Sequence, residues 1–128
     1  MTAPHILIVD DDEILASLLE LTLEIEGYRV STAHDGEEAL VHMAQGGIDL
    51  VVLDLVMPKM DGVRFLRVLN KKGEARPPVI VISSTAGNSL SDEFRSLGVV
   101  AIARKPVEPA WLVSEIGTAL HGGQLLRQ

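Results

Sequence analysis

The feature that most constrains the fold is an unbroken apolar run that ends in a single carboxylate. Residues 50–53 read Leu-Val-Val-Leu, Asp54 follows directly, and the loop after it contains Pro58 and the pair Asp61-Gly62. A short continuous apolar run bounded by turn residues is typical of a strand buried on both faces. Such strands belong to parallel sheets, and ligands bind at the carboxyl ends of their strands. Asp54 is therefore predicted to lie at a functional edge of a sheet.

Similar runs recur along the chain and alternate with helical patterns. Strands are predicted at residues 5–9, 28–33, 49–54, 79–82 and 99–103. Helices are predicted between and after them, at residues 14–25, 36–45, 63–72, 89–97 and 109–121. Five strands alternating with five helices predict an α/β fold, with a parallel sheet covered by helices on both faces.

The first predicted helix carries apolar and small residues at spacings of three and four. Glu20, Glu24 and Glu26 lie off this stripe. The pattern predicts an amphipathic helix with one apolar face. Its members are Ile14, Leu15, Leu18, Leu19, Thr22 and Ile25.

Composition excludes several classes of function. A length of 128 residues suits one domain, and the net charge of -7 disfavours a direct nucleic-acid partner, because phosphate binding needs excess Lys and Arg. The four aromatic residues are too few for a base-stacking platform, and the absence of cysteine excludes disulfides and zinc-thiolate sites. No apolar run reaches membrane-spanning length and no signal segment opens the chain. We expect a cytoplasmic protein without membrane insertion.

Polar side chains gather where the predicted strands end. Asp10 and Asp11 follow the first strand, Asp54 the third, Ser83 the fourth and Lys105 the fifth. Parallel strands share one polarity, so these residues should meet at one edge. Three neighbouring carboxylates would raise one another's pKa unless a cation relieved them, and Mg²⁺ accepts carboxylates, water and phosphate oxygens. The lysine and the hydroxyl would suit a phosphoryl group.

Each of these residues also has a plainer interpretation. The acids at 10–13 could cap the following helix, and Asp54 could cap a turn. Ser83 could be an ordinary turn hydroxyl, and Lys105 a solvated strand end. Their joint placement at four strand ends is harder to explain by capping than any one of them alone.

Four segments together resemble the receiver domains of two-component response regulators. Residues 6–13 read Ile-Leu-Ile-Val-Asp-Asp-Asp-Glu, and residues 53–62 read Leu-Asp-Leu-Val-Met-Pro-Lys-Met-Asp-Gly. The pair Lys105-Pro106 and the segment at residues 32–40 match as well. The resemblance runs from about residue 5 to residue 121. It implies one receiver domain over residues 1–128, with a flavodoxin-like (βα)₅ fold and strand order 2-1-3-4-5.

The resemblance also implies the chemistry of the site. Asp54 would accept a phosphoryl group from a phosphohistidine on a sensor histidine kinase or a phosphotransfer protein. The protein would then be a phosphoacceptor rather than an enzyme with a separate substrate. Mg²⁺, or Mn²⁺ in its place, would be held by Asp11 and Asp54, by Asp10 largely through water, and by the backbone carbonyl of Val56.

The remaining roles follow from the same resemblance. Ser83 would hydrogen-bond the phosphoryl group, Lys105 would pair with it, and the Lys105-Pro106 bond would be cis. The phosphodonor would lay a helix against the first helix of the chain, with Leu15 and Leu18 as candidate contacts.

The sequence departs from the family pattern at three places. Ile102 stands where the family often has Tyr or Phe, Val107 where Phe often follows Lys-Pro, and Ser84 where Ala or Gly is usual. The aromatic part of the signalling switch is thus absent. We expect the response to phosphate to lie mainly in the loop after the fourth strand and the helix from Ser89.

Two other classes of function compete with this interpretation. A haloacid dehalogenase-like phosphohydrolase would need a second Asp two residues after Asp54, where the chain has Val56. An interaction module without phosphate would not require the complete set of acids, hydroxyl and lysine. The Met1 start suggests a natural N-terminus, and both a stand-alone receiver and a receiver within a larger regulator stay open, as does the downstream target.

Overall fold

The computed structural model describes residues 3–57, 60–71, 76–84 and 91–121. Within that part of the chain, no helix combines the length and apolar character needed to cross a membrane. Strands and helices alternate as the sequence predicts. In chain order they are β1 (His5–Val9), α1 (Glu13–Ile25), β2 (Arg29–Ala33), α2 (Gly36–Gln45), β3 (Leu50–Asp54), α3 (Gly62–Lys71), β4 (Val79–Ser83), α4 (Asp92–Ser96), β5 (Val99–Arg104) and α5 (Pro109–His121).

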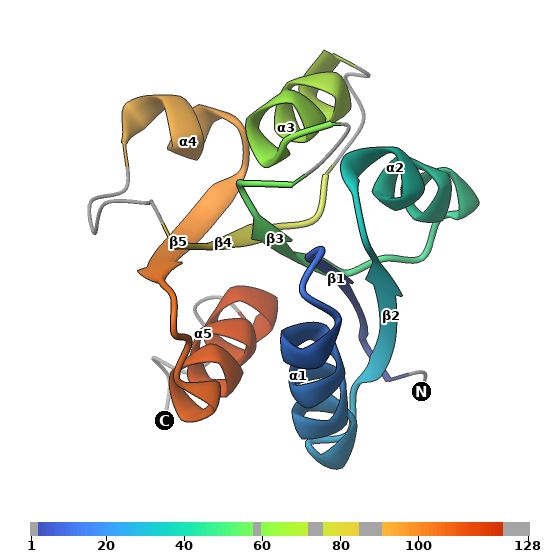
Figure 1. Ribbon diagram of the computed structural model, residues 1–128, viewed down its shortest axis with the longest axis vertical. Coiled ribbons are helices and arrows are strands. Elements are labelled where there is room, and N and C mark those ends of the chain that lie inside the picture. Colours follow the sequence, from blue (N-terminus) through green and yellow to red (C-terminus); the bar gives the residue numbers. More distant parts are fainter. Residues whose placement is uncertain (1–2, 58–59, 72–75, 85–90, 122–128) are drawn as a thin grey trace.

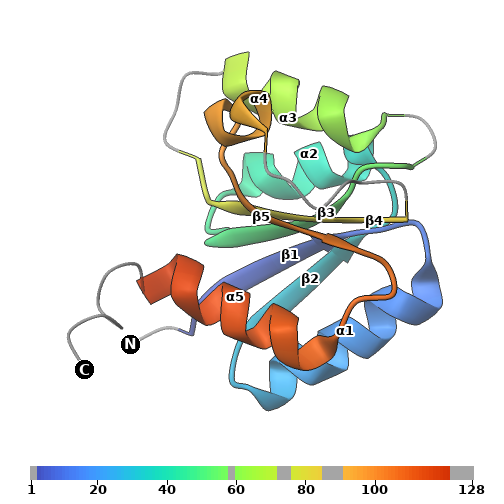
Figure 2. The same ribbon diagram turned by 90° about the vertical axis from the view of Figure 1, so that its left-hand side faces the viewer.

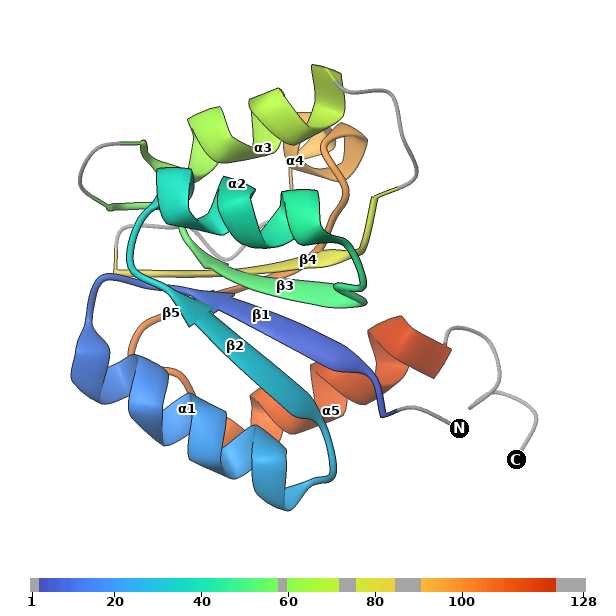
Figure 3. The same ribbon diagram turned by 90° about the vertical axis from the view of Figure 1, so that its right-hand side faces the viewer.

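The strands form one parallel sheet of order β2-β1-β3-β4-β5. Helices α1 and α5 cover one face, and α2, α3 and α4 cover the other (Figures 1, 2 and 3). The predicted flavodoxin-like fold and strand order are confirmed. Helix α4 is shorter than the predicted helix at 89–97, and residues 85–90 lie outside the described part of the chain.

Alternation along the buried strands separates two hydrophobic cores. In β3, Val51 and Leu53 belong to the core under α2, α3 and α4, whereas Leu50 and Val52 belong to the core under α1 and α5. Successive side chains of a strand point to opposite faces, so Asp54 falls on the α1–α5 side. A strand buried on both faces thus places one carboxylate at the edge of the sheet.

Capping of the following helix explains one of the acids that come after β1. Asp12 is the N-cap of α1, and its side chain accepts hydrogen bonds of 3.1 Å from the N–H groups of Ile14 and Leu15. Asp10 instead lies fully buried at the sheet edge. Capping therefore accounts for Asp12 and leaves Asp10 to be explained by the site.

The apolar stripe predicted on α1 is only partly buried. The ridge buried against the sheet consists of Ala16, Leu19 and Leu23. Ile14 and Leu18 are instead exposed to solvent. Apolar and small residues occupy more than half of the circumference of α1, so spacings of three and four do not reveal which part of it packs on the sheet.

Gly62 allows the start of α3 to lie directly on the end of β3. A Cβ atom at this position would lie 2.7 Å from the carbonyl oxygen of Asp54 and 2.7 Å from the Cα of Leu55. The N–H of Gly62 also donates to the carbonyl of Leu55 at 2.9 Å. The Asp-Gly in the sequence motif therefore serves this close backbone approach.

We expect Gly62→Ala to lower the free energy of unfolding by about 1–3 kcal/mol, because the clash is with backbone that must shift. Gly117→Ala in α5 is the matched control. Its Cβ would meet nothing within 4 Å, so it should leave stability unchanged or raise it by up to about 1 kcal/mol. Urea unfolding measures both. Equal stability of the two variants would contradict the close approach.

Candidate phosphoryl-acceptor site

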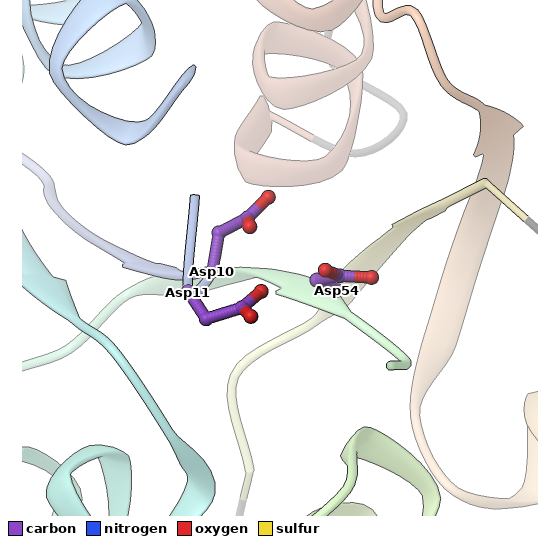
Figure 4. Close-up of side chains that lie close together, drawn as sticks. All are labelled: Asp10, Asp11 and Asp54. Carbon is purple, nitrogen blue, oxygen red and sulfur yellow. The ribbon is translucent and has the colours of Figure 1, made fainter. Parts of the chain in front are cut away.

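The site forms where β1 and β3 end side by side. Val9 pairs with Leu53 in the sheet register, so the residues that follow both strands meet at the same edge. Carboxylate oxygens of Asp10, Asp11 and Asp54 all lie within 4.8 Å of one another. Figure 4 shows the three side chains extending from these two strand ends. The structure thus brings together the acids that the sequence placed at the edge.

Lys105 bridges two of these acids. Its Nζ donates to Asp54 Oδ2 at 3.2 Å and lies 2.9 Å from Asp10 Oδ2. Asp10 Oδ1 accepts the N–H of Asp12 at 2.9 Å, but the buried Oδ2 has no partner at hydrogen-bonding angles among the described residues. Its contact with Lys105 is an ion pair, and the oxygen keeps a lone pair for a further ligand.

The electrostatics of Asp54 follow from its burial and its neighbours. Burial raises the pKa of Asp54, and the charge of Asp10 adds to the rise, while the N–H of Val56 at 3.1 Å and the ammonium of Lys105 oppose it. Burial disfavours the charged form of Lys105 and acts to lower its pKa. The carboxylates of Asp10 and Asp54 outweigh burial, so the pKa of Lys105 is raised. The site holds three carboxylates and one ammonium, which leaves it with excess negative charge.

The other predicted site residues also lie at this edge. Asp54 pairs with Ile82 in the register, which sets the buried Ser83 one residue further along β4. The N–H of Lys105 donates to the carbonyl of Ser83 at 2.9 Å, and the Lys105-Pro106 bond is cis, as expected. Val56, whose N–H donates to Asp54, is 55% exposed.

The residues present fit a hard divalent cation. They offer only oxygen ligands, from buried Asp10 and Asp54 and exposed Asp11. Their excess negative charge and the unused lone pair of Asp10 Oδ2 both favour a cation there. The cluster is therefore consistent with a divalent metal site of the receiver type.

Sequence reasoning missed one feature of the site. The sequence suggests Lys105 as a partner of the incoming phosphoryl group, whereas the structure pairs it with Asp10 and Asp54. No spacing in the sequence indicates that contact, because its residues come from three separate strand ends. The distances from the Lys105 ammonium to the two carboxylates are seen only in the structure.

A buried carboxylate at a strand end, beside two further acids and a lysine, is the arrangement expected of a phosphoacceptor domain and is consistent with a divalent metal site. Residues 6–117 match the family described as response regulator receiver domain. The chain belongs to this family, whose members are phosphoacceptors and not conventional enzymes, and whose partner is a histidine kinase.

The relatives agree with this assignment. The uncharacterized transcriptional regulatory protein YkoG of Bacillus subtilis is 41% identical over 123 residues, which cover 94% of this chain and 53% of the relative. The transcriptional regulatory protein CpxR of Escherichia coli is 41% identical over 91% of this chain and 49% of its own length. This chain thus spans about half the length of these curated relatives. The solved structure of the Vibrio cholerae chemotaxis protein CheY4 is 26% identical, with a TM-score of 0.83, over 93% of this chain and 100% of that chain.

Proposed function

We propose that Asp54 accepts a phosphoryl group from a phosphohistidine of a sensor histidine kinase or a phosphotransfer protein. The observation that carries the proposal is the placement of Asp54 itself. Its carboxylate is buried at the end of β3, hydrogen-bonded to Lys105 and surrounded by the acids Asp10 and Asp11. We propose that one receiver domain occupies residues 1–128, with its core at about residues 5–121.

In this reaction a carboxylate oxygen of Asp54 attacks phosphorus. The bond from phosphorus to the imidazole nitrogen breaks, a bond to the carboxylate oxygen forms, and the released imidazole takes a proton from solvent. The N–H of Val56 orients the attacking carboxylate through Oδ1. Lys105 leaves its resting contacts to pair with the phosphoryl oxygens, and the Ser83 hydroxyl donates a hydrogen bond to them.

Asp11, Asp10, Asp54 and the backbone carbonyl of Val56 would hold Mg²⁺, with Mn²⁺ as a substitute. As the family resemblance implies, Asp10 would act largely through water, with Oδ2 as the available oxygen because Oδ1 accepts the N–H of Asp12. The bound ion would neutralise charge on the transferring group. Without it, the three carboxylates would repel an anionic donor.

The proposed donor contacts differ in exposure. Leu18 is 51% exposed on α1 and available to a partner. Leu15 is only partly exposed, because it packs against the core under α1 and α5. Leu18 is therefore the stronger candidate for contact with the donor helix.

Beryllium trifluoride, an analogue of the phosphoryl group, tests this site. With Mg²⁺, we expect it to shift the NMR signals of Ser83, Lys105 and the residues next to Asp54. Asp54→Asn should remove these shifts, because the analogue needs the carboxylate oxygen. Undiminished binding to Asp54→Asn would place the acceptor elsewhere.

The lifetime of the phosphoryl group should depend on Val56. Hydrolysis needs a water in line behind phosphorus, and Val56 stands at the exposed edge of the site without a polar group to orient it. We expect Val56→Asn to shorten the lifetime about tenfold, the effect of one added hydrogen bond. Val56→Leu is the apolar control and should not shorten it. A decay rate unchanged in Val56→Asn would contradict this role. Thr85, the second residue expected to flank this water, lies outside the described residues.

The response to phosphate is proposed to lie between Ser84 and Phe94. Ile102 is partly buried against the core under α2, α3 and α4, lacks a hydroxyl and is stiff at χ1. Most of the proposed segment, residues 85–90, lies outside the described residues.

A further inference from the structure

The turn that joins β2 to α2 contacts the loop that carries the first site acids. Val9 pairs with Ala33 in the sheet register, and the N–H of Asp10 donates to the carbonyl of Ala33 at 3.0 Å. The next residue of the turn, His34, lies 3.4 Å from Glu13, the first residue of α1. The end of β2 thus holds the loop between β1 and α1 at both of its ends.

The other side of the same turn lies against the loop after β3. Gly36, the first residue of α2, is buried beside Met60. A Cβ atom on Gly36 would lie 2.7 Å from the carbonyl oxygen of Met60, 2.8 Å from its Cβ and 2.9 Å from its Cγ. The backbone of Gly36 lies outside the left-handed region that favours glycine. The close approach of Met60 is therefore the reason why this position suits glycine.

Two glycine contacts thus hold the loop between β3 and α3. Gly62 lies against the backbone of Leu55 at one end, and Gly36 lies against Met60 near the other. Figure 3 shows α2 and α3 starting at the same end of the sheet. Val56, whose carbonyl is a proposed ligand of Mg²⁺, lies between the two contacts. A displacement of Met60 should therefore shift the backbone that carries this carbonyl.

The spacing between the two loops matters more to Mg²⁺ than to Ca²⁺. The proposed ligands Asp10 and Asp11 follow β1, whereas the carbonyl of Val56 follows β3. Mg²⁺ demands near-ideal octahedral geometry with ligands at about 2.0–2.1 Å, and Ca²⁺ accepts irregular geometry at about 2.3–2.6 Å. A shift of one loop relative to the other should therefore cost Mg²⁺ more affinity than Ca²⁺.

We infer that residues 33–36 form a brace that sets the spacing of the two ligand-bearing loops, and that Gly36 and Met60 thereby position the site for Mg²⁺ over Ca²⁺. The inference rests on the proposed function, because it requires a Mg²⁺ site at the acceptor edge. It adds positioning residues that are not themselves ligands and that act only through the loops they contact.

Gly36→Ala tests the brace, because the added methyl group must displace the backbone of Met60. We expect its affinity for Mg²⁺ to fall about tenfold, the lower end of the cost of losing an outer support of a metal site, and its affinity for Ca²⁺ to fall much less. NMR titrations with each ion, followed at the amides of Asp11 and Val56, measure both affinities. Gly117→Ala is the matched control: its Cβ would meet nothing within 4 Å, so it should keep the wild-type ratio of the two affinities.

Met60→Ala decides the matter if Gly36→Ala does not fold. It shortens the Met60 side chain at the same contact without adding a clash, and it should lower the ratio of Mg²⁺ to Ca²⁺ affinity several-fold, because the loop loses support from α2. A wild-type ratio in either variant, or an equal fall in Gly117→Ala, would overturn the inference. A wild type that neither binds Mg²⁺ nor is labelled by acetyl phosphate would overturn the proposed function as well. A wild type that does both, with unchanged ratios in the variants, would refute the brace alone.

Discussion

Asp54→Asn is expected to abolish labelling by acetyl phosphate and, at neutral pH, to raise the free energy of unfolding of the metal-free protein. The amide is not a nucleophile, so labelling should fall to background. Burial raises the pKa of Asp54, which means that its ionised form destabilises the fold. Lys105 keeps Asp10 as its partner in the variant. We expect a gain of about 0.5–2 kcal/mol, the usual size of such stabilising changes.

The sign of the pH dependence follows from the raised pKa of Asp54. A carboxyl whose pKa is raised on folding contributes stability below its ordinary pKa of 3.8, and that contribution is lost as the pH rises through the raised value. The free energy of unfolding of the wild type should therefore approach that of Asp54→Asn in acid and be lower than it at neutral pH. Urea unfolding in EDTA across this range measures the difference.

Asp92→Asn is the control for this experiment. It makes the same chemical change on an exposed residue of α4, so its stability should stay within about 0.5 kcal/mol of the wild type. A less stable Asp54→Asn at neutral pH would mean that the ion pair with Lys105 outweighs the burial of the charge.

Asp11→Ala is expected to weaken binding of Mg²⁺ roughly 10- to 100-fold, the cost of one charged ligand at about 1.5–3 kcal/mol. Asp11 is the exposed member of the acidic cluster, so its removal should leave the fold intact. Calorimetric titration with Mg²⁺, or with Mn²⁺, measures the affinity.

Asp12→Asn is the matched control for Asp11→Ala. It removes the same charge one residue along the chain, while Asn preserves the cap of α1. If both variants lost affinity equally, the net charge of the loop and not coordination by Asp11 would explain the effect.

The sequence was sufficient to predict the layout of the fold and the position of the site. Runs such as residues 50–53 are apolar at every position, so they predict strands buried on both faces and therefore a parallel sheet. Shared strand polarity then brings Asp10, Asp54 and Lys105 to one edge. These conclusions need only the period of the pattern and the polarity of the strands.

The remaining features depend on distances that no local pattern contains. The bridge from Lys105 to Asp10 and Asp54 depends on how far the lysine side chain reaches across the sheet edge. The need for glycine at position 62 depends on how closely α3 approaches β3. On α1, Leu18 and Leu19 fit the same apolar spacing, and only packing against the sheet leaves Leu18 exposed.

Mapping the site of metal-dependent labelling tests the central claim most directly. The wild type is treated with acetyl phosphate in Mg²⁺ or in excess EDTA, and its mass and proteolytic peptides are measured after acid quenching. We expect the mass of one phosphoryl group, on the peptide containing Asp54, with Mg²⁺ and not with EDTA. Undiminished labelling in EDTA, or a phosphoryl group on another residue, would contradict the assignment of Asp54 as the metal-dependent acceptor.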